Sequence, residues 1–583
     1  MENDKKVILS IKDLVVKFHV RGRVLTAIRG ISLDIYENES IAIVGESGSG
    51  KSVFTKTFAG MLDSNGFIDE GSIIFNDDDI ARTRVKKNRF ALKLINFIQN
   101  KLDTYSKLLN GANTYKKILE LKSEYGAKLD LTEVEKEEID NQIEELNYQA
   151  TEKFNQLLTL DRKNQKDEIT ALKAEIAEHK NEIKELENRK KELISKHKEE
   201  TNNDVEYLNE YKTKLAELEA KYKEEISQEM DPKYAERNKR IAKEIYLSIG
   251  RYPKLASIKL SFKLMRSFKK AMKLGVDLDD PVLLGQVFDT VVFRVAYTDE
   301  DDEYINGLAD LDISKVKYAR DWQQIRGSKV ATVFQDPMTS LNPIITIGKQ
   351  ITSVIMKHQN CSLDEARIRA IDLMGKVGIP NPEKRFDDYP FQYSGGMRQR
   401  IVIAIALSCQ PKILICDEPT TALDVTIQAQ ILKLIKDLQR EFNYTIVFIT
   451  HDLGVVANIA DRVAVLYAGQ IVEIGTCEDV FYDPRHPYTW ALLSSLPQLA
   501  ERGTELYSIA GTPPSLYNKI IGDPFAPRNP YCLRIDTLMD APMFKVSDTH
   551  YAKTWLLDPR SPKVEKPEAI QNIHEKLLKV FNI

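Results

Sequence analysis

A glycine-rich stretch that directly follows a short apolar segment carries the clearest chemical signal in the sequence. The segment Ile41–Val44 leads into Gly45-Glu-Ser-Gly-Ser-Gly-Lys-Ser52, the pattern of a phosphate-binding loop (P-loop) between a strand and a helix. Backbone N–H groups of such a loop close around phosphate, and the helix N-terminus adds partial positive charge. We therefore expect Lys51 to reach the β and γ oxygens of ATP and Ser52 to ligate Mg²⁺. The remaining phosphate contacts would come from Gly45, Ser47, Gly48, Ser49 and Gly50.

Two acidic residues end a second apolar segment. Asp417 and Glu418 follow Ile413-Leu-Ile-Cys416. Alone, such a pair is usually only the polar end of a strand. With a P-loop upstream, the first carboxylate can hold the Mg²⁺ shell and the second can orient or deprotonate a water. We therefore predict that Asp417 belongs to a metal site and that Glu418 is the catalytic base.

A serine and two glycines form a further candidate phosphate contact. Ser394, Gly395 and Gly396 precede a helical pattern, so a hydroxyl and free amides can hold phosphate at a second helix N-terminus. By itself, Ser-Gly-Gly is more typical of a turn.

The order of these motifs resembles that of the ABC ATPases. Tyr393–Arg400 is similar to the signature sequence of that family, and Gln335, Asp424 and His451 stand in segments that resemble its Q-loop, D-loop and switch histidine. The resemblance implies that Gln335 serves both the metal and the catalytic site, that Asp424 belongs to the nucleotide site, and that His451 senses the γ-phosphate. It also implies that Phe18 stacks on adenine, although a single aromatic residue in a strand can equally belong to the core.

Further segments narrow the resemblance to the D-type ATPase subunit of oligopeptide and dipeptide permeases. They are Phe334–Pro343, His486–Leu493 and Gly511–Pro514, and the similarity covers residues 7–81 and 321–556. It implies ATP hydrolysis coupled to peptide import at the cytoplasmic face of the plasma membrane, with ATP held between two ATPase subunits. The partners would be a second ABC ATPase subunit of a related F-type, two membrane permease subunits and, indirectly, an extracytoplasmic peptide-binding protein. The transported ligand stays open among dipeptides, longer peptides, nickel and glutathione.

Two other classes of ATPase share parts of this pattern. An SMC-like ATPase that acts on DNA also has an ABC head divided by a coiled coil, but its Q-loop would precede the coil, whereas Gln335 follows the helical segment described next. An ABC-F translation factor would need two P-loops in one chain, and this sequence has one. The net charge of −4 gives no global reason to bind nucleic acid, so we expect no such partner.

Residues 82–320 differ in composition from the rest and are predicted to be an insertion. In them 91 of 239 positions are charged, against 79 of 344 elsewhere. Outside, short β-branched runs alternate with helical patterns, which indicates an α/β fold with a mainly parallel sheet. We expect an ABC-type nucleotide-binding domain in two parts (1–81 and 321–475), with a helical signature subdomain and a C-terminal extension (476–583). The apolar runs are too short to cross a membrane, and the N-terminus shows no secretory signal, so the cytoplasm is the expected compartment.

The insertion has the apolar spacing of long helices. No Gly or Pro occurs between Gly126 and Pro232, and apolar residues recur at steps of three and four. An antiparallel coiled coil within the chain, pairing between molecules and a single charged helix are the open alternatives. Asn202–Asp204 would reverse the chain between two arms, and Thr132 with Glu135 would form a capping box. The three apolar series are Ile139, Ile143, Leu146, Ala150, Leu157, Leu160; Ile169, Leu172, Ile176, Ile183, Leu186, Leu193, interrupted by His179 and Lys190; and Leu208, Tyr211, Leu215, Leu218, Tyr222.

The segment 251–273 contains eight basic residues and no acidic one, interleaved with apolar residues. This pattern predicts a basic amphipathic helix. Its charges could form a solvated face over a core stripe, or they could contact anionic lipid or a membrane partner.

The C-terminal extension lacks the four cysteines with which some relatives in this permease family hold an iron–sulfur cluster. Such clusters need thiolate ligands, so we expect none here. In the family's pattern the ligand positions fall on Asp523, Asn529, Asp536 and Thr554. The region should instead be held by packing of its aromatic residues, with Asp523 or Asp536 paired to Arg528 or Arg534. These aromatic residues are Phe525, Tyr531, Phe544 and Trp555.

Overall fold

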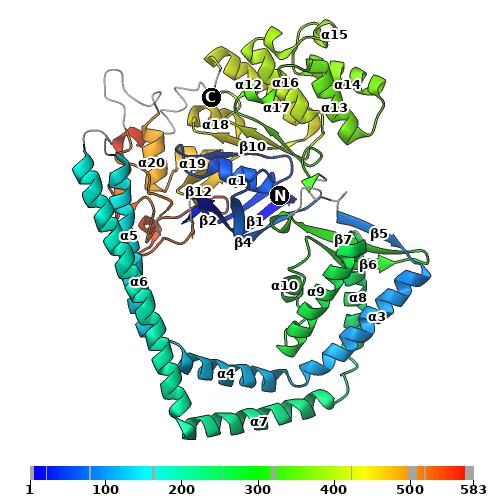
Figure 1. Cartoon of the computed structure of the whole chain (residues 1–583). Coiled ribbons are helices and arrows are strands. Elements are labelled where there is room, and N and C mark those ends of the chain that lie inside the picture. Colours follow the sequence, from blue (N-terminus) through cyan, green and yellow to red (C-terminus); the bar gives the residue numbers. More distant parts are fainter. Residues whose placement is uncertain are drawn as a thin grey trace. The chain divides into compact units, whose positions relative to one another are not determined.

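The computed structural model describes residues 6–20, 23–77, 81–159, 165–252, 254–316, 322–323, 325–421, 423–496, 508–517 and 520–571. The chain divides into two compact units (Figure 1): residues 1–80 with 310–583, here called the head, and residues 81–309, here called the insertion. The insertion ends before the expected boundary at 320, because Leu311 and Asp312 pair with a strand of the head.

An eight-stranded sheet forms the centre of the head, in the order β13-β14-β12-β11-β3-β10-β9-β8. Its parallel strands are β3 (Ser40–Val44), β8 (Val330–Val333), β9 (Ile413–Asp417), β10 (Thr445–Thr450) and β11 (Arg462–Tyr467). Its antiparallel strands are β12 (Gln470–Thr476), β13 (Phe544–Lys545) and β14 (Tyr551–Ala552). Every residue of β3 and β10 is buried, as in parallel strands that are covered on both faces. Because parallel strands end at one edge, the loops after β3, β9 and β10 meet there.

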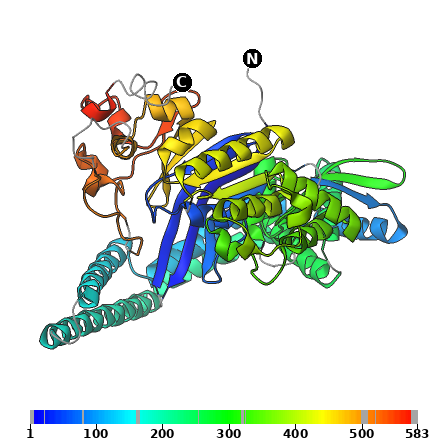
Figure 2. The same cartoon turned by 90° about the horizontal axis from the view of Figure 1, so that it is seen from above.

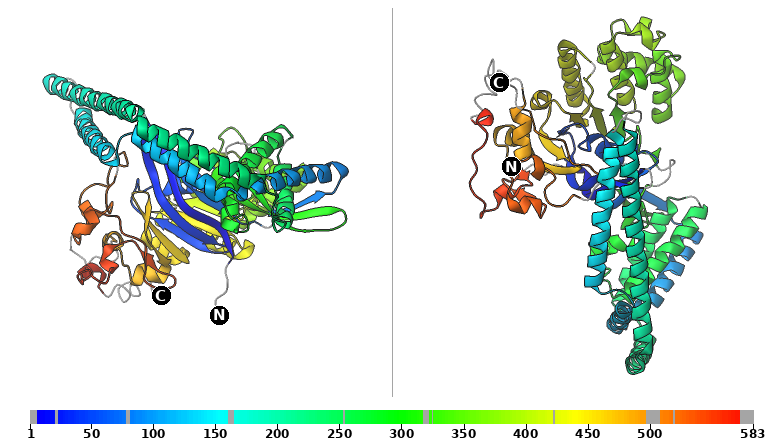
Figure 3. Two further views of the ribbon diagram at one scale, coloured as in Figure 1. Left: turned by 90° about the horizontal axis from the view of Figure 1, so that it is seen from below. Right: turned by 60° about the vertical axis from the view of Figure 1, so that its left-hand side comes forward.

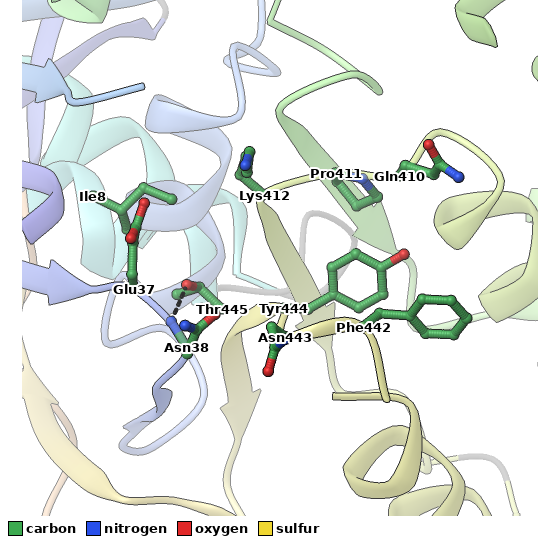
Figure 4. A pocket seen from close by; sticks show the side chains of 10 residues that line it. All are labelled: Ile8, Glu37, Asn38, Gln410, Pro411, Lys412, Phe442, Asn443, Tyr444 and Thr445. Carbon is green, nitrogen blue, oxygen red and sulfur yellow. Dashed lines mark hydrogen bonds between the residues drawn. The ribbon is translucent and has the colours of Figure 1, made fainter. Parts of the chain in front are cut away.

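The opposite edge of this sheet holds a hollow of about 370 Å³. Figure 4 shows its lining side chains, among them Glu37, Asn38 and Lys412, which come shortly before β3 and β9. The backbone N–H of Asn38 donates to the hydroxyl of Thr445 over 2.9 Å. Phosphate-binding loops follow the carboxyl ends of parallel strands, so this hollow is separate from the predicted nucleotide site.

A second sheet of the head is antiparallel. It contains β1 (Val7–Val20), β2 (Arg23–Tyr36) and β4 (Gly66–Phe75). The last residues of β7 (Tyr304–Asp312) extend it, where Leu311 pairs with Phe75. This sheet carries Phe18 on β1.

Helices connect the strands of the central sheet. They are α1 (Lys51–Phe58), α17 (Val425–Phe442) and α18 (Leu453–Ile459), and the predicted signature subdomain contains α12 (Pro337–Ser340), α13 (Ile347–Gln359), α14 (Leu363–Lys376), α15 (Pro382–Arg385) and α16 (Gly395–Leu407). One apolar core runs from these helices through the sheet into the C-terminal extension. In Figure 2 the extension, with α19 (Cys477–Tyr482) and α20 (Pro487–Ser494), is coloured yellow-orange to red and gathers at one side of the head.

The insertion has a core of its own. β5 (Arg82–Lys86) and β6 (Phe293–Glu300) pair with β7, and α3 (Arg89–Ser106), α8 (Tyr234–Gly250), α9 (Lys254–Lys273) and α10 (Pro281–Val287) share one apolar cluster. Arg82 pairs with Leu308, so the two ends of the insertion lie next to each other. The fully buried members of this cluster include Leu102, Ile241, Ile245, Leu264, Phe268 and Met272.

Four further helices of the insertion form two antiparallel pairs. They are α4 (Ala112–Leu129), α5 (Glu133–Thr159), α6 (Lys166–Asn203) and α7 (Val205–Ser227). Lys153 near the end of α5 contacts Glu175 near the start of α6, while Asp140 near the start of α5 contacts Lys190 further along α6. Figure 3 shows α5 and α6 side by side. The predicted helices are therefore present, and they pair within the chain.

The second pair and the turns differ in part from the prediction. Tyr125 of α4 stacks on Tyr211 of α7 with ring centroids 4.4 Å apart, so α7 pairs with α4 and does not fold back along α6. The prediction of a reversal at Asn202–Asp204 is wrong, because this segment joins two helices that belong to different pairs. Leu160, which ends the first apolar series, lies outside the described residues.

The predicted capping box of α5 is confirmed by its hydrogen bonds. The Glu135 carboxylate accepts from the N–H of Thr132 over 3.0 Å, and the Thr132 hydroxyl accepts from the N–H of Glu135 over 3.3 Å.

Candidate functional site

The P-loop joins β3 to α1 in a backbone conformation that favours glycine. Gly45 and Gly50 have φ angles of 154° and 103°. A Cβ atom on Gly45 would lie 2.2 Å from the carbonyl oxygen of Leu466, so no other residue fits at this position. The glycines keep side chains away from the loop where α1 begins, which is the arrangement that binds phosphate.

Lys51 and Ser49 are the loop side chains best placed for an anionic ligand. Lys51 is buried, and its Nζ donates to the carbonyl oxygens of Gly45 and Glu46 over 2.7 and 2.9 Å. Burial lowers the pKa of Lys51, against the opposing effect of nearby carboxylates. The Ser49 hydroxyl is buried and has no hydrogen-bond partner among the residues that the structure describes. A phosphate group accepts hydrogen bonds from both groups, so these residues fit a nucleotide.

Asp417 ends β9 beside the start of α1, and its carboxylate is hydrogen-bonded to the side chain of Ser52. Burial raises the pKa of Asp417, and the charge of the adjacent Glu418 raises it further. A bound cation would offset both effects. The Ser52 hydroxyl and the Asp417 carboxylate are oxygen ligands of the kind that Mg²⁺ binds, so the two residues fit that ion.

Glu418 is held by three side chains that come from different loops. Its carboxylate lies 2.8 Å from Nε2 of Gln335, 3.0 Å from the hydroxyl of Thr421 and 2.9 Å from Nδ1 of His451. Burial raises the pKa of Glu418, but the hydrogen bonds from His451 and Thr421 outweigh it and lower the pKa overall. The ionised, proton-accepting form is therefore favoured. Glu418 also has a φ of 44°, a left-handed conformation that a non-glycine residue adopts at a cost.

The predicted signature and D-loop residues form a second group. The Ser394 hydroxyl accepts from the N–H of Met397 and caps α16, and the Asp424 carboxylate caps α17. A Cβ atom on Gly396 would lie 2.8 Å from a methyl group of Ile427, and one on Gly395 would lie 4.0 Å from Leu423. The predicted residues thus divide: the P-loop, Asp417, Glu418, Gln335 and His451 converge at the carboxyl edge of the sheet, while Ser394–Gly396 and Asp424 lie around the start of α17.

Phe18 packs as a core residue does. It is 9% exposed. A Cβ atom on Gly66 would lie 2.6 Å from its ring, so β4 needs glycine there to accommodate the aromatic side chain.

The sequence reasoning missed a contact between the P-loop and the C-terminal extension. Arg528 donates from both Nη atoms to the two carboxylate oxygens of Glu46, over 2.7 and 3.0 Å, and from Nη1 to the hydroxyl of Tyr467 over 3.1 Å. The hydroxyl of Tyr488 accepts from the N–H of Glu46 over 2.8 Å. The arginine side chain is 4% exposed. Glu46 is a P-loop residue, so the extension fixes this loop through its side chain and its backbone.

The predicted pairing of Arg528 with Asp523 or Asp536 is therefore wrong. These two carboxylates instead accept hydrogen bonds from nearby backbone N–H groups. The other two residues at the positions where some relatives hold a cluster do the same. Four buried side chains cap four turns: Asp523 accepts from Phe525 over 2.9 Å, Asn529 from Tyr531 over 2.9 Å, Asp536 from Leu533 over 2.6 Å, and Thr554 from Leu556 over 3.3 Å.

The aromatic residues named for this region make ring contacts. Phe525 contacts Tyr467 with centroids 5.3 Å apart, Tyr531 contacts Trp490 at 5.3 Å, and Phe544 contacts Trp555 at 6.0 Å.

Burial raises the pKa of Asp523 to about 6.

Comparison with known proteins finds matches to two family models and to several well-described relatives. Residues 28–256 and 298–421 match the family model described as ABC transporter, and residues 472–535 match that of the oligopeptide/dipeptide transporter C-terminal region. The chain is 66% identical over 266 residues to an oligopeptide transport ATP-binding protein, AmiE, of Streptococcus pneumoniae. The aligned region covers 46% of this chain and 75% of the relative.

Two further relatives are similar over the same share of length. An oligopeptide transport ATP-binding protein, OppD, of Bacillus subtilis is 60% identical over 263 residues, covering 45% of this chain and 74% of the relative. A dipeptide transport ATP-binding protein, DppD, of Lactococcus lactis is 58% identical over 251 residues, covering 43% and 72%. Of the helices that the structure describes, none is both long and apolar enough to cross a membrane.

Proposed function

The chain belongs to the ABC transporter family, and from that premise we propose that it is the ATP-hydrolysing subunit of an importer of oligopeptides or dipeptides. The observation that carries the catalytic part is the convergence on Glu418 of Gln335, Thr421 and His451, beside the P-loop. The names of the relatives and the match of residues 472–535 support the peptide substrate.

Each residue of the site has a role in this proposal. Lys51, Ser49 and the loop amides bind the phosphates, and Ser52, Asp417 and Gln335 hold Mg²⁺, which would neutralise charge on the transferred phosphoryl group. Glu418, ionised and oriented by its three partners, takes a proton from the attacking water. His451 holds Glu418 and contacts the γ-phosphate.

The second group of residues suggests how two subunits share ATP. Ser394, Gly395, Gly396 and Asp424 lie around the start of α17, whereas the P-loop precedes α1. We propose that they serve the nucleotide of a second ATPase subunit facing this one, with a related F-type chain as the partner. Phe18 contributes to adenine binding only if its ring becomes uncovered.

The remaining partners follow from the same assignment. Two membrane permease subunits would receive the motion of the ATPase pair at the cytoplasmic face of the plasma membrane, and an extracytoplasmic binding protein would deliver the peptide to them. Nucleic acid has no place in this scheme, and the relatives do not support an SMC-like function.

We further propose that residues 81–309 are a module inserted into this ATPase and that α5 with α6 forms an antiparallel coiled coil. The adjacent ends of the insertion and its separate core support the module. The C-terminal extension would fold without an iron–sulfur cluster, since its four candidate positions are occupied by aspartate, asparagine and threonine side chains that cap turns. Iron and sulfide analysis of anaerobically purified protein tests this, and stoichiometric amounts of both would contradict it.

Copurification and transport test the proposal together. The chain should be isolated from its native membrane with all partners identified, and the complex reconstituted in vesicles with labelled peptides. We expect ATP-dependent uptake that is lost in Lys51→Ala. ATP hydrolysis without copurifying membrane proteins, or uptake of nickel or glutathione but not of peptides, would contradict the assigned role.

A further inference from the structure

The outer face of α9 carries apolar side chains that the core of the insertion does not use. Leu255, Ile258 and Phe262 are 81%, 55% and 68% exposed. Their spacing places them on one face of the helix. The opposite face supplies Leu264 and Phe268 to the core of the insertion, and both are fully buried. α9 (labelled in Figure 1) is therefore apolar on two faces, and only one of them is covered.

Cations lie along one side of this exposed apolar face and beyond its C-terminal end. From Arg251 to Val276 the chain has no acidic residue, although the charges of the region 82–320 as a whole are nearly balanced, with 46 basic and 45 acidic residues. The basic side chains that border the apolar face or continue it towards the helix C-terminus are all exposed, and none forms an ion pair with a residue that the structure describes. They are Lys259, Lys263, Arg266, Lys269 and Lys270.

An apolar patch flanked by cations matches the boundary layer of an anionic bilayer. Leucine, isoleucine and phenylalanine enter the layer between headgroups and acyl chains, while lysine and arginine reach lipid phosphates. A nucleic-acid backbone would use the cations but would leave Leu255, Ile258 and Phe262 in water. The charge and the apolar face together therefore favour a lipid surface over a polyanion.

We propose that α9 is an interfacial membrane-binding helix that gives this subunit a second attachment to the bilayer, independent of the permease subunits. Leu255, Ile258 and Phe262 lie in the headgroup layer, and the five cations bind anionic lipid phosphates. This goes beyond the ATPase function, because α9 contains no residue of the nucleotide site.

The test is flotation of the full chain with large unilamellar vesicles. Vesicles of phosphatidylcholine with 30% phosphatidylglycerol are compared with pure phosphatidylcholine at several NaCl concentrations. We expect binding to the anionic vesicles that weakens as salt rises. The triple variant Leu255→Ser/Ile258→Ser/Phe262→Ser should reduce the bound fraction at least about tenfold, since it removes the apolar contribution. Lys259→Gln/Lys263→Gln/Arg266→Gln should weaken binding and flatten its salt dependence.

Matched controls come from other helices of the insertion. Val134 and Val205 are 75% and 66% exposed on α5 and α7, so Val134→Ser/Val205→Ser removes exposed apolar groups elsewhere. Lys180→Gln/Lys184→Gln/Lys191→Gln removes three exposed charges from α6. Both controls should bind vesicles as the unaltered chain does. Phe262→Trp offers a second readout that does not depend on loss of binding: brominated lipid should quench its added emission.

Several results would overturn the proposal. They are equal binding to both vesicle types, unchanged binding by the serine triple variant, and absence of brominated-lipid quenching at Phe262→Trp. Displacement by inorganic phosphate at matched ionic strength would identify a soluble phosphate ligand instead. Binding only to membranes that contain the permease subunits, lost in the serine variant, would identify a protein partner. If the unaltered chain does not bind vesicles but hydrolyses ATP, the membrane proposal fails and the proposed ATPase function stands.

Discussion

A glutamate contacts a histidine in both units of the molecule, and the surroundings of Glu418–His451 in the head differ from those of His179–Glu182 in the insertion. In the head, Glu418 follows a buried strand and meets His451 from the loop after the neighbouring strand, with Gln335 and Thr421 as further partners. In the insertion, His179 and Glu182 lie 3.2 Å apart on one helix, and the glutamate is 47% exposed. Glu418 becomes a candidate for chemistry because further side chains from separate loops converge on it beside the P-loop, whereas the His179–Glu182 pair joins neighbouring turns of one helix.

Two ion pairs show a similar contrast. In the head, Arg528 reaches Glu46 across 482 positions of sequence and is 4% exposed. In the insertion, Lys153 and Glu175 contact each other between two helices with side chains 31% and 45% exposed. Exposed pairs of this kind contribute about 0–1 kcal/mol. The buried Arg528 therefore fixes the P-loop through Glu46, whereas the exposed Lys153–Glu175 pair adds little to its helix pair.

The largest expected effect comes from removing the catalytic carboxylate. Glu418→Gln keeps the shape but not the charge, so ATP binding should remain while hydrolysis falls by about 10²- to 10⁴-fold. Glu182→Gln makes the same change in the His179–Glu182 pair and should leave both ATP binding and hydrolysis unchanged. Binding of labelled ATP and steady-state phosphate release measure the two quantities. Hydrolysis within twofold of the unaltered chain in Glu418→Gln would remove the basis of the comparison.

The pH dependence of stability should differ between the units because of Asp523. Its pKa is raised to about 6 in the folded head, from an ordinary value of 3.8, so folding favours the protonated form. The stabilisation is present in full below about pH 4 and is lost as the pH rises through about 6, a change of about 3 kcal/mol.

Asp523→Asn should remove that change and make the head more stable than the unaltered chain near pH 7.5, because an amide oxygen can still accept from the N–H of Phe525. Urea unfolding at a series of pH values measures the effect. Asp140→Asn, in the helix pair of the insertion, is the control and should leave the pH dependence of the head's stability unchanged. A head that Asp523→Asn destabilises at every pH would show that the charge is needed.

A smaller effect on stability is expected from removing the contact between Arg528 of the extension and Glu46 of the P-loop. Arg528→Leu leaves Glu46 without its bidentate partner, and because that carboxylate is 24% exposed the cost should be about 2 kcal/mol, below the range for a fully buried pair. ATP affinity should fall with it, since Glu46 belongs to the P-loop. Arg528→Lys should recover part of the loss, because lysine keeps the charge but not the two parallel hydrogen bonds.

Lys153→Leu in the insertion is the control and should change neither stability of the head nor ATP affinity. Calorimetry with ATP and urea unfolding separate the two effects. An unchanged ATP affinity in Arg528→Leu would mean that the extension only packs against the loop. A double-mutant cycle with Glu46→Gln should show non-additive effects.

Local signals in the sequence were sufficient for the features that depend on neighbouring residues. The P-loop is defined by glycine spacing within eight positions, and the Thr132–Glu135 cap by a three-residue spacing. Asp417 and Glu418 could be predicted as a site because they end an apolar strand in a chain that has a P-loop, whereas His451 was assigned only through the resemblance to ABC ATPases.

Features that depend on tertiary packing could not be predicted in this way. An apolar seam shows that a helix needs a partner but not which one, so the pairing of α7 with α4 was missed. Nothing local in the sequence connects Glu46 with Arg528. An arginine partner was predicted for Asp523, but this carboxylate accepts a hydrogen bond from the backbone of its own turn. The left-handed φ of Glu418 likewise depends on the loops packed around it.

Deleting the insertion tests whether the head needs it in order to fold. Phe75 pairs with Leu311, so a short Gly/Ser linker replacing residues 78–309 should close a hairpin and keep Asp77, which contacts Lys329 over 2.8 Å. We expect a folded head with unchanged ATP affinity and a thermal midpoint shifted by only a few degrees.

A wider deletion of residues 78–315 is the matched control. It also removes Leu311 and Ile313, each 1% exposed, and should lower the thermal midpoint clearly. If the narrow deletion also fails to fold, the insertion is part of the core of the head and the contrast between the units is wrong.

The smallest effect is expected where a charge interrupts an apolar seam of the insertion. Lys190 contacts Asp140 over 2.7 Å, and their side chains are 30% and 45% exposed. In Lys190→Leu, the loss of an exposed ion pair is offset by new apolar contact with α5, so the net change should stay within about 1 kcal/mol. Asp140 remains in water, unlike Glu46 after Arg528→Leu, so no buried charge is left unpaired. Hydrogen exchange of the α5 and α6 amides measures this locally, and their protection should change by less than about fivefold. A much larger loss of protection along both helices would show that this ion pair specifies the helix pairing, as buried contacts do in the head.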